Sequence, residues 1–198
     1  MSTTQPLRPA IFLDRDGTLA HEVGYINHVS RFRLYPFAPA TIRAINGAGW
    51  AAVVVTNQAG VARGYFPESL IASVHEEMRR SIEGGGAKLD AVYYCPHHPD
   101  AGEPPYRSDC DCRKPRPGMV RRAASELSLD LERSWVIGDR LGDLQLAWNV
   151  GARGALVKTG YGAGDLAASE GQSRQPDLVA ENAFAAVHHI LGEAGSVS

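Results

Sequence analysis

The stretch Ile11-Phe12-Leu13-Asp14-Arg15-Asp16-Gly17-Thr18 governs the interpretation of the rest of this 198-residue chain. Three apolar residues lead into two acidic residues and a glycine, a pattern typical of a buried strand that ends at its carboxyl edge. Residues two apart in an extended chain point to the same side, so Asp14 and Asp16 are predicted to face one pocket beyond the strand. Two carboxylates at such a short distance repel each other unless a cation or a shared proton lies between them. The stretch therefore predicts a ligand site that needs a cation.

The composition is that of an ordinary globular protein, with 44% hydrophobic and 21% charged residues and a formal net charge of -2. Nucleic-acid-binding proteins usually carry a basic excess, so we expect no nucleic-acid partner. No stretch approaches the roughly 18 apolar residues of a membrane span. Residues 1–9 are interpreted as a flexible polar lead-in without the apolar region of a secretory signal. We expect a single domain over residues 1–198, located in the cytoplasm with no membrane partner, where cysteines favour metal ligation or free thiols over disulfides.

Apolar runs and helical segments alternate along the chain. Strands are predicted over 10–14, 51–56, 91–95, 135–138 and 154–157, and helices over 39–48, 67–83, 118–129, 141–150 and 182–191. Strands that alternate with helices are joined by right-handed crossovers, so the expected fold class is α/β, a Rossmann-like parallel sheet with helices on both faces. The connections over 15–35 and 96–117 are long for a compact domain, and long loops at strand ends are often functional.

Polar residues follow several of the predicted strands. Asp14 fits a carboxylate nucleophile that takes a phosphoryl group, with Asp16 as the acid/base partner, although paired acids also form helix caps and turns. Thr56 can hydrogen-bond a phosphoryl oxygen, although hydroxyl residues are also common turn formers. Asp139 follows a later strand and can reach the same pocket, where carboxylates, waters and a phosphoryl oxygen would form a Mg²⁺ site.

Charged residues farther along the chain have two possible interpretations each. Lys114 is either a solvated charge or the fixed cation that offsets phosphoryl charge, and Arg113 beside it would then grip the substrate. Asp143 either assists the metal site or lies in the first turn of a helix, where the helix dipole favours an acid.

The pattern Cys95-x-His97 followed by Cys110-x-Cys112 places all three cysteines and a histidine within 18 residues. Thiolates and an imidazole at paired short spacings are typical of a tetrahedral Cys₃His zinc site, and four protein ligands make the zinc structural. His98 is an adjacent alternative ligand, but the spacing favours His97. The zinc loop, residues 95–112, would hold the nearby Lys114 in place.

In this order the motifs resemble those of the haloacid dehalogenase superfamily of phosphatases over residues 10–158. Asp14-Arg15-Asp16-Gly17-Thr18 matches the first motif of the superfamily, and Thr56, Lys114 and Asp139 match the other three. The segments 12–18, 56–64 (Thr-Asn-Gln-Ala-Gly-Val-Ala-Arg-Gly), 95–99 and 110–115 carry a closer resemblance, to the family of D-glycero-D-manno-heptose-1,7-bisphosphate 7-phosphatases. That family lacks a large cap domain, keeps a zinc-bound loop beside the site and acts in making nucleotide-activated heptose for bacterial surface glycans.

The resemblance implies a role for each matching residue. Asp14 would be the nucleophile and Asp16 the proton donor, and Thr56 and Lys114 would stabilise the phosphoryl group. Mg²⁺ would be held by Asp14, the backbone carbonyl of Asp16, and Asp139. The implied substrate contacts come from Arg15, Glu22, Val23, Gly24, Tyr25, Asn57, Gln58, Ala59, Arg113 and Arg140. Arg140 stands where the family has lysine, so charge is kept but geometry is not. The implied partner is a small-molecule sugar bisphosphate, and the implied protein is a monomer.

Three alternatives compete with this interpretation. Histidinol-phosphate phosphatase shares the catalytic motifs and the zinc loop, but Gly60–Gly64 and the Gly24-Tyr25 pair favour the heptose family. A DNA 3′-phosphatase module also begins with Asp-x-Asp-Gly-Thr, and the near-neutral charge of the chain speaks against it. A non-enzymatic zinc-stabilised binding module would require a dead site, whereas the four motif residues are all present. The sequence leaves open the anomer of the substrate and the choice between an ADP- and a GDP-heptose route.

Overall fold

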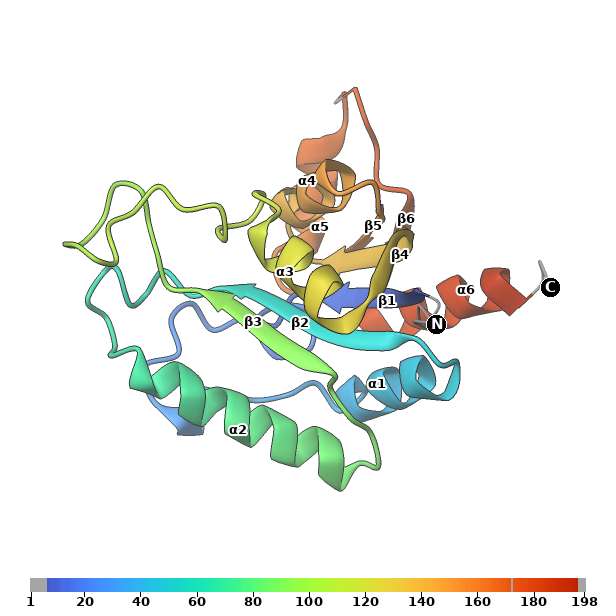
Figure 1. Ribbon diagram of the computed structural model, residues 1–198, viewed down its shortest axis with the longest axis horizontal. Helices are drawn as coiled ribbons and strands as arrows, with labels where there is room; N and C mark the ends of the chain where they lie inside the picture. The colour runs from blue at the N-terminus through green and yellow to red at the C-terminus, as the bar shows by residue number, and fades with distance from the viewer. Residues whose placement is uncertain (1–6, 172, 196–198) are drawn as a thin grey trace, which may run out of the picture.

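The computed structural model describes residues 7–171 and 173–195 and is built on a six-stranded parallel sheet (Figure 1). The strand order is β3-β2-β1-β4-β5-β6, and every neighbouring pair is parallel. The strands are β1 (Arg8–Leu13), β2 (Ala51–Asn57), β3 (Ala91–Cys95), β4 (Leu129–Gly138), β5 (Arg153–Val157) and β6 (Leu178–Ala180). The predicted α/β fold class is confirmed.

Helices cover both faces of this sheet. In Figure 1, α1 (Ala38–Gly47) and α2 (Ser69–Gly84) lie below the strands, and α6 (Ala183–Gly195), at the right, packs into the same core cluster as these two helices. On the opposite side lie α3 (Gly118–Leu127), α4 (Leu141–Asn149) and α5 (Gly162–Ser169), and a short 3-10 turn, η1 (Val29–Arg31), interrupts the first long loop. Because both faces are covered, the central strands β1 and β2, the second half of β4 and most of β5 are buried, and their sequences are nearly continuous apolar runs.

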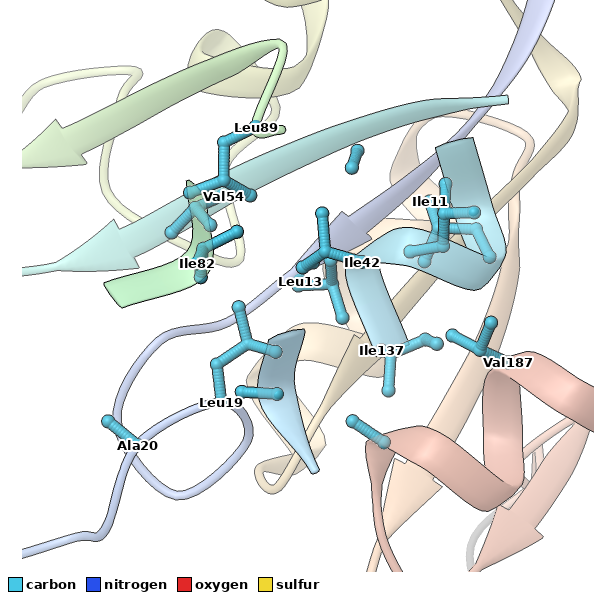
Figure 2. Close-up of a cluster of buried hydrophobic side chains, with 14 of the residues drawn as sticks. Ile11, Leu13, Leu19, Ala20, Ile42, Val54, Ile82, Leu89, Ile137 and Val187 are labelled. Atoms are coloured by element: carbon cyan, nitrogen blue, oxygen red, sulfur yellow. The ribbon is translucent and has the colours of Figure 1, made fainter. Parts of the chain in front are cut away.

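Alternate residues of β1 supply the two halves of the core. Ile11 and Leu13 pack with residues of α1, α2 and α6, as Figure 2 shows for the neighbours Ile42, Ile82 and Val187. The intervening residues of β1 pack into a second cluster that contains residues of α3 and α4. Because alternate side chains of a strand point to opposite faces, β1 is packed on both sides at the centre of the molecule.

The chain reverses its direction of winding between β1 and β4. From β1 it proceeds outward through β2 to β3, and then it returns to the other side of β1 to form β4, β5 and β6. Leu13 is in register with Ile137, and Asp14 N donates a hydrogen bond of 2.9 Å to Ile137 O. Parallel sheets bind ligands in the crevice at such a switch point, so the fold itself directs attention to the residues that follow β1 and β4.

Several boundaries differ from the sequence-based expectation. Helix α5 and strand β6 were not predicted, because one is short and rich in Gly and Ala and the other has only three residues. The helix expected over 118–129 ends at Leu127, where Ser128 has a positive φ, and β4 begins directly afterwards at Leu129 because its first residues pair with Arg8 and Pro9. Those two residues therefore belong to β1 and not to a flexible lead-in.

Of the rest of that lead-in, Leu7 is exposed and precedes β1, and residues 1–6 lie outside the described residues. Within residues 7–171 and 173–195, no helix is long and apolar enough to cross a membrane.

Candidate active site

A cavity of about 220 Å³ opens where β1, β2 and β4 end. Its lining combines acidic, basic and polar side chains with aromatic and aliphatic ones and three glycines. They are Asp14, Asp16, Glu22, Gly24, Tyr25, Ile26, Thr56, Asn57, Gln58, Ala59, Gly60, Phe66, Lys114, Asp139, Arg140, Gly142, Asp143 and Tyr161. All four motif residues that the sequence singled out therefore meet in one place.

Three carboxylates form the floor of this cavity. Asp14, Asp139 and Asp143 are buried, and each offers an oxygen within 4.8 Å of the others. Burial, reinforced by the neighbouring carboxylates, raises the pKa of Asp14 to about 6 and that of Asp139 to about 8. Among the described residues, the buried Oδ1 of Asp139 has no hydrogen-bond partner. A compact set of hard oxygen donors with one unpaired oxygen fits a divalent cation such as Mg²⁺.

Lys114 supplies a fixed positive charge beside this floor. Its Nζ lies 2.7 Å from Asp14 Oδ1 and 2.7 Å from Asp143 Oδ1, and it donates a further bond to Val55 O at 3.0 Å. Burial opposes the charge, but the two carboxylates outweigh that effect and raise the pKa of Lys114. Asn57 accepts from Lys114 N (3.0 Å) and donates to Lys114 O (3.2 Å), which fixes the backbone of the lysine.

Asp143 occupies both of the positions that the sequence presented as alternatives, one within the carboxylate cluster and one in the first turn of a helix. It lies in the first turn of α4, where its Oδ2 accepts from Arg140 N at 3.2 Å, and its Oδ1 pairs with Lys114. A Cβ at Gly138 would lie 2.1 Å from Asp143 Oδ2, so the glycine before Asp139 makes room for this carboxylate.

The turn after β1 brings backbone against the same floor. Gly17 has a φ of +82°, and a Cβ there would lie 2.1 Å from Asp139 Oδ2. Thr159 Oγ1 donates to Gly17 O at 2.6 Å and ties this turn to the loop after β5. Glycine is therefore required at this position both for its backbone conformation and for its lack of a side chain.

Asp16 is held by two neighbours. Its two carboxylate oxygens accept from Arg15 Nε (3.1 Å) and Nη2 (2.8 Å), and Oδ2 also accepts from Gln58 Nε2 (2.9 Å). Gln58 Nε2 lies 2.9 Å from Thr56 Oγ1 as well, which links the first two motifs. The prediction that Arg15 contacts substrate does not fit this arrangement, because Arg15 is 1% exposed, is absent from the cavity lining and is turned toward Asp16.

The predicted substrate contacts divide into two groups. Glu22, Gly24, Tyr25, Asn57, Gln58, Ala59 and Arg140 line the cavity. Val23 packs against the core instead, and Arg113 lies outside the lining, where its Nη1 donates to His97 O at 3.3 Å. The structure thus places these two residues outside the cavity lining, because the first loop turns one side chain toward the core and His97 O accepts a bond from the arginine. Substrate contact by either residue stays a prediction.

The cavity mouth includes residues that the sequence did not single out as substrate contacts. Ile26, Gly60, Phe66 and Tyr161 line it, and Tyr161 N donates to Asp139 Oδ2 at 2.8 Å. The guanidinium of Arg140 lies 4.4 Å from the centre of the Tyr161 ring, and its Nε lies 3.5 Å from Asp165 Oδ2. The position of Tyr161 after a parallel strand was the available signal, because all such strands end at the same edge of the sheet.

The zinc loop, residues 95–112, gathers its four predicted ligands. Cys95, His97, Cys110 and Cys112 each offer a ligand atom within 4.8 Å of the others. Cys112 Sγ lies 3.1 Å from Cys95 Sγ, 3.2 Å from Cys110 Sγ and 3.3 Å from His97 Nδ1. Three sulfurs and an imidazole nitrogen that face one another in this way are compatible with a tetrahedral metal site.

Comparisons with known proteins agree with one another. Residues 111–186 match a family model described as HAD-hydrolase-like. The chain is 45% identical to D-glycero-beta-D-manno-heptose-1,7-bisphosphate 7-phosphatase from Photorhabdus laumondii, over 77% of this chain and 81% of the relative. It is 41% identical to D-glycero-D-manno-heptose-1,7-bisphosphate 7-phosphatase from Thermosynechococcus vestitus, over 92% of this chain and 95% of the relative.

A solved structure gives the same result in three dimensions. The crystal structure of D,D-heptose 1,7-bisphosphate phosphatase from B. bronchiseptica, complexed with magnesium and phosphate, superposes with a TM-score of 0.83 at 34% identity. The match covers 93% of this chain and 99% of that one. The likeness therefore extends over the sheet, the helices and the loops that surround the cavity.

Proposed function

Because this chain is a phosphatase that belongs to the heptose-1,7-bisphosphate 7-phosphatase family of haloacid dehalogenase-like hydrolases, we propose that it removes the 7-phosphate of D-glycero-D-manno-heptose 1,7-bisphosphate. The product would enter the biosynthesis of nucleotide-activated heptose. The observation that carries the proposal is the contact between Asp14 Oδ1 and Lys114 Nζ (2.7 Å) at the floor of a cavity whose mouth carries Arg140. This arrangement offers a nucleophile, a fixed cation and a second anion-binding group.

The proposed reaction has two steps. A carboxylate oxygen of Asp14 attacks the phosphorus, an aspartyl phosphate forms, and the bond between phosphorus and the sugar oxygen breaks as Asp16 gives that oxygen a proton. Asp16 then takes a proton from a water molecule that attacks the aspartyl phosphate, which releases phosphate and restores Asp14. Lys114 and Thr56 offset the charge on the phosphoryl oxygens in both steps.

Two metals accompany this proposal. Asp14, the backbone carbonyl of Asp16, and Asp139 would hold Mg²⁺, which would offset charge on the carboxylates and on the phosphoryl group. Cys95, His97, Cys110 and Cys112 would hold a structural Zn²⁺ with no open coordination position. The raised pKa values of Asp14 and Asp139 and the unpaired oxygen of Asp139 support the first site, and the four converging ligand atoms support the second.

The proposed partner is thus a small-molecule sugar bisphosphate, and no nucleic acid or membrane is part of the proposal. We also propose a monomer that works in the cytoplasm, where thiols stay reduced and available to zinc. Arg140 is the proposed contact for the second phosphate, because it is the guanidinium at the mouth of the cavity.

A substrate comparison tests the proposal. Phosphate release would be measured side by side from the α and β anomers of heptose 1,7-bisphosphate and from histidinol phosphate, with Mg²⁺ present. We expect kcat/KM for one heptose anomer to exceed that for histidinol phosphate by about tenfold or more, since the charged contact between the second phosphate and Arg140 is lost with the smaller substrate. A preference for histidinol phosphate would overturn the substrate assignment and leave the phosphatase chemistry in place.

A further inference from the structure

We propose that His75, on the buried side of α2, is a positioning residue for the proton donor Asp16 and acts on it through Arg15. The inference rests on the proposed function in one respect, the assignment of Asp16 as the acid that protonates the leaving oxygen. His75 lies outside the cavity lining and matches none of the four motifs, so its effect on the reaction would be indirect.

Arg15 is the link between the two residues. Two of its nitrogens, Nε and Nη2, donate to the carboxylate of Asp16, and Nη1 lies 3.2 Å from His75 Nε2. The guanidinium also lies 5.8 Å from the centre of the Phe32 ring. Because the arginine is almost fully buried, these neighbours and not water determine where its fork points, and the fork in turn orients Asp16.

The chemical state of His75 suits this role. Burial, together with the positive charge of Arg15, lowers the pKa of His75 to about 3, so the imidazole is neutral at working pH. A guanidinium can only donate hydrogen bonds, so Nε2 must accept and the ring proton must lie on Nδ1. Val74 and Met78 on the same helix are core residues, which fixes the imidazole on α2 relative to the sheet.

Removal of this acceptor would leave Nη1 of Arg15 as a buried donor without a partner, at a cost that favours movement of the guanidinium. Asp16 would then keep the bond from Gln58 but lose the fixed two-point contact with Arg15. Proton transfer needs the acid within hydrogen-bond reach of the leaving oxygen, so a misplaced Asp16 slows this step. The contact between Asp14 and Lys114 involves neither His75 nor Arg15 and should persist.

The leaving group of the substrate separates this role from a merely structural one. A sugar alkoxide is a poor leaving group and needs a proton from Asp16 as the bond to phosphorus breaks. A p-nitrophenolate leaves readily without one. Displacement of Asp16 should therefore slow the first step, phosphoryl transfer to Asp14, for an alkyl phosphate and spare that step for p-nitrophenyl phosphate, whereas general damage to the fold slows it for both. The second step needs Asp16 with either substrate, so the two substrates are compared in the first turnover only.

The test compares His75→Leu with His75→Gln, whose side-chain oxygen can accept from Arg15. For heptose 1,7-bisphosphate we expect His75→Leu to lower the single-turnover rate of the first step about tenfold, with KM changed by less than about twofold. For p-nitrophenyl phosphate the first-turnover release of p-nitrophenolate by the same variant should slow by less than about twofold, and His75→Gln should restore most of the loss on the sugar substrate. If His75→Leu does not fold, His75→Asn replaces it, because the shorter amide does not reach Arg15.

Asp16→Asn is the matched control. The proposal is overturned if Asp16→Asn shows the selective loss but His75→Leu slows both substrates equally, or if His75→Gln performs no better than His75→Leu. A uniform loss in Asp16→Asn would instead overturn the proton-donor assignment on which the proposal stands. If the wild-type enzyme does not hydrolyse the heptose substrate, glycerol 2-phosphate serves as the alkyl phosphate, so that failure of the substrate assignment is recognised separately.

Discussion

The floor and the mouth of the cavity are built on different principles. The three carboxylates of the floor, with Thr56 and Lys114 beside them, have nearly buried side chains that are attached to strand ends or held by two or more bonds. At the mouth, the side chains of Arg140 and Asp165 are 50% and 21% exposed and meet at 3.5 Å, while Tyr25 and Tyr161 are 42% and 48% exposed. The floor is preorganised for phosphoryl transfer, and the mouth is a set of adaptable loop contacts.

This difference implies that chemistry and substrate choice reside in separate parts of the molecule. Buried charges that are paired and hydrogen-bonded act strongly, because little water screens them. Exposed contacts at the mouth are each worth far less. Substitutions in the floor should therefore abolish turnover of every phosphate ester, and substitutions at the mouth should shift KM between substrates.

The largest effect is expected from Asp14→Asn. Loss of the nucleophile should lower kcat by about 10⁴-fold or more on every phosphate ester, because the covalent step is removed. Steady-state kinetics measures this loss, and circular dichroism and metal analysis should show an unchanged fold and zinc content. Activity near the wild-type level would remove Asp14 from the role of nucleophile.

Loss of one proposed zinc ligand should rank second. Cys110→Ser is expected to release the metal and to lower the free energy of unfolding by about 3 kcal/mol, since a structural metal stabilises the loop that contains it. Because Lys114 follows the zinc loop directly, kcat should fall as well. Urea unfolding and metal analysis of the purified protein check this, with Ser108→Ala in the same loop as the control. An unchanged zinc content in Cys110→Ser would contradict the ligand set.

The floor should also make stability depend on pH. The folded-state pKa values of Asp14 (about 6) and Asp139 (about 8) lie above the value of about 4 for an unfolded aspartate. The folded protein therefore binds more protons in this range, and without Mg²⁺ its stability should fall by about 2 kcal/mol as the pH rises from about 6 to about 8.

Urea unfolding at the two pH values measures this fall, and Mg²⁺ should stabilise the protein more at the higher pH because it replaces the lost protons. Asp139→Asn should flatten the pH dependence. A wild-type protein that becomes more stable as the pH rises over this interval would show that the floor is not a cluster of unbalanced carboxylates.

The smallest effect is expected at the mouth. Arg140→Ala should raise KM for the bisphosphate about tenfold and change kcat by less than about twofold, because a half-exposed guanidinium contributes about 1.4 kcal/mol to the binding of a phosphate. Arg140→Lys should lie between the two, since it keeps the charge without the planar fork. A large loss in kcat with an unchanged KM would show that Arg140 acts in the reaction step, and it would contradict the distinction between floor and mouth.

The sequence predicted the floor well for a physical reason. Asp14, Thr56 and Asp139 each follow an apolar run, and parallel strands end at one edge, so the three could be brought together without coordinates. The four predicted zinc ligands followed from short spacings that the local chain geometry enforces, whereas the role of Lys114 followed from its resemblance to a superfamily motif. The fold class followed from the alternation of strands and helices.

The mouth was predicted less well. Tyr161 and Phe66 reach the cavity through loop conformations that no local pattern fixes, and Val23 and Arg113 are turned away from it by packing and by a bond to His97 O. Arg15 was expected to contact substrate. Its side chain is instead buried against Asp16 and His75, which its position beside Asp16 in the sequence does not reveal. The short elements α5 and β6 were missed because a few Gly, Ala and apolar residues carry no periodic signal.

The most direct test of the account is a ³¹P NMR time course of heptose 1,7-bisphosphate with the wild-type enzyme and Mg²⁺. We expect the resonance of the 7-phosphate to disappear as inorganic phosphate appears, while the resonance of the 1-phosphate persists. Loss of the 1-phosphate, or no change in either resonance, would contradict the proposed function.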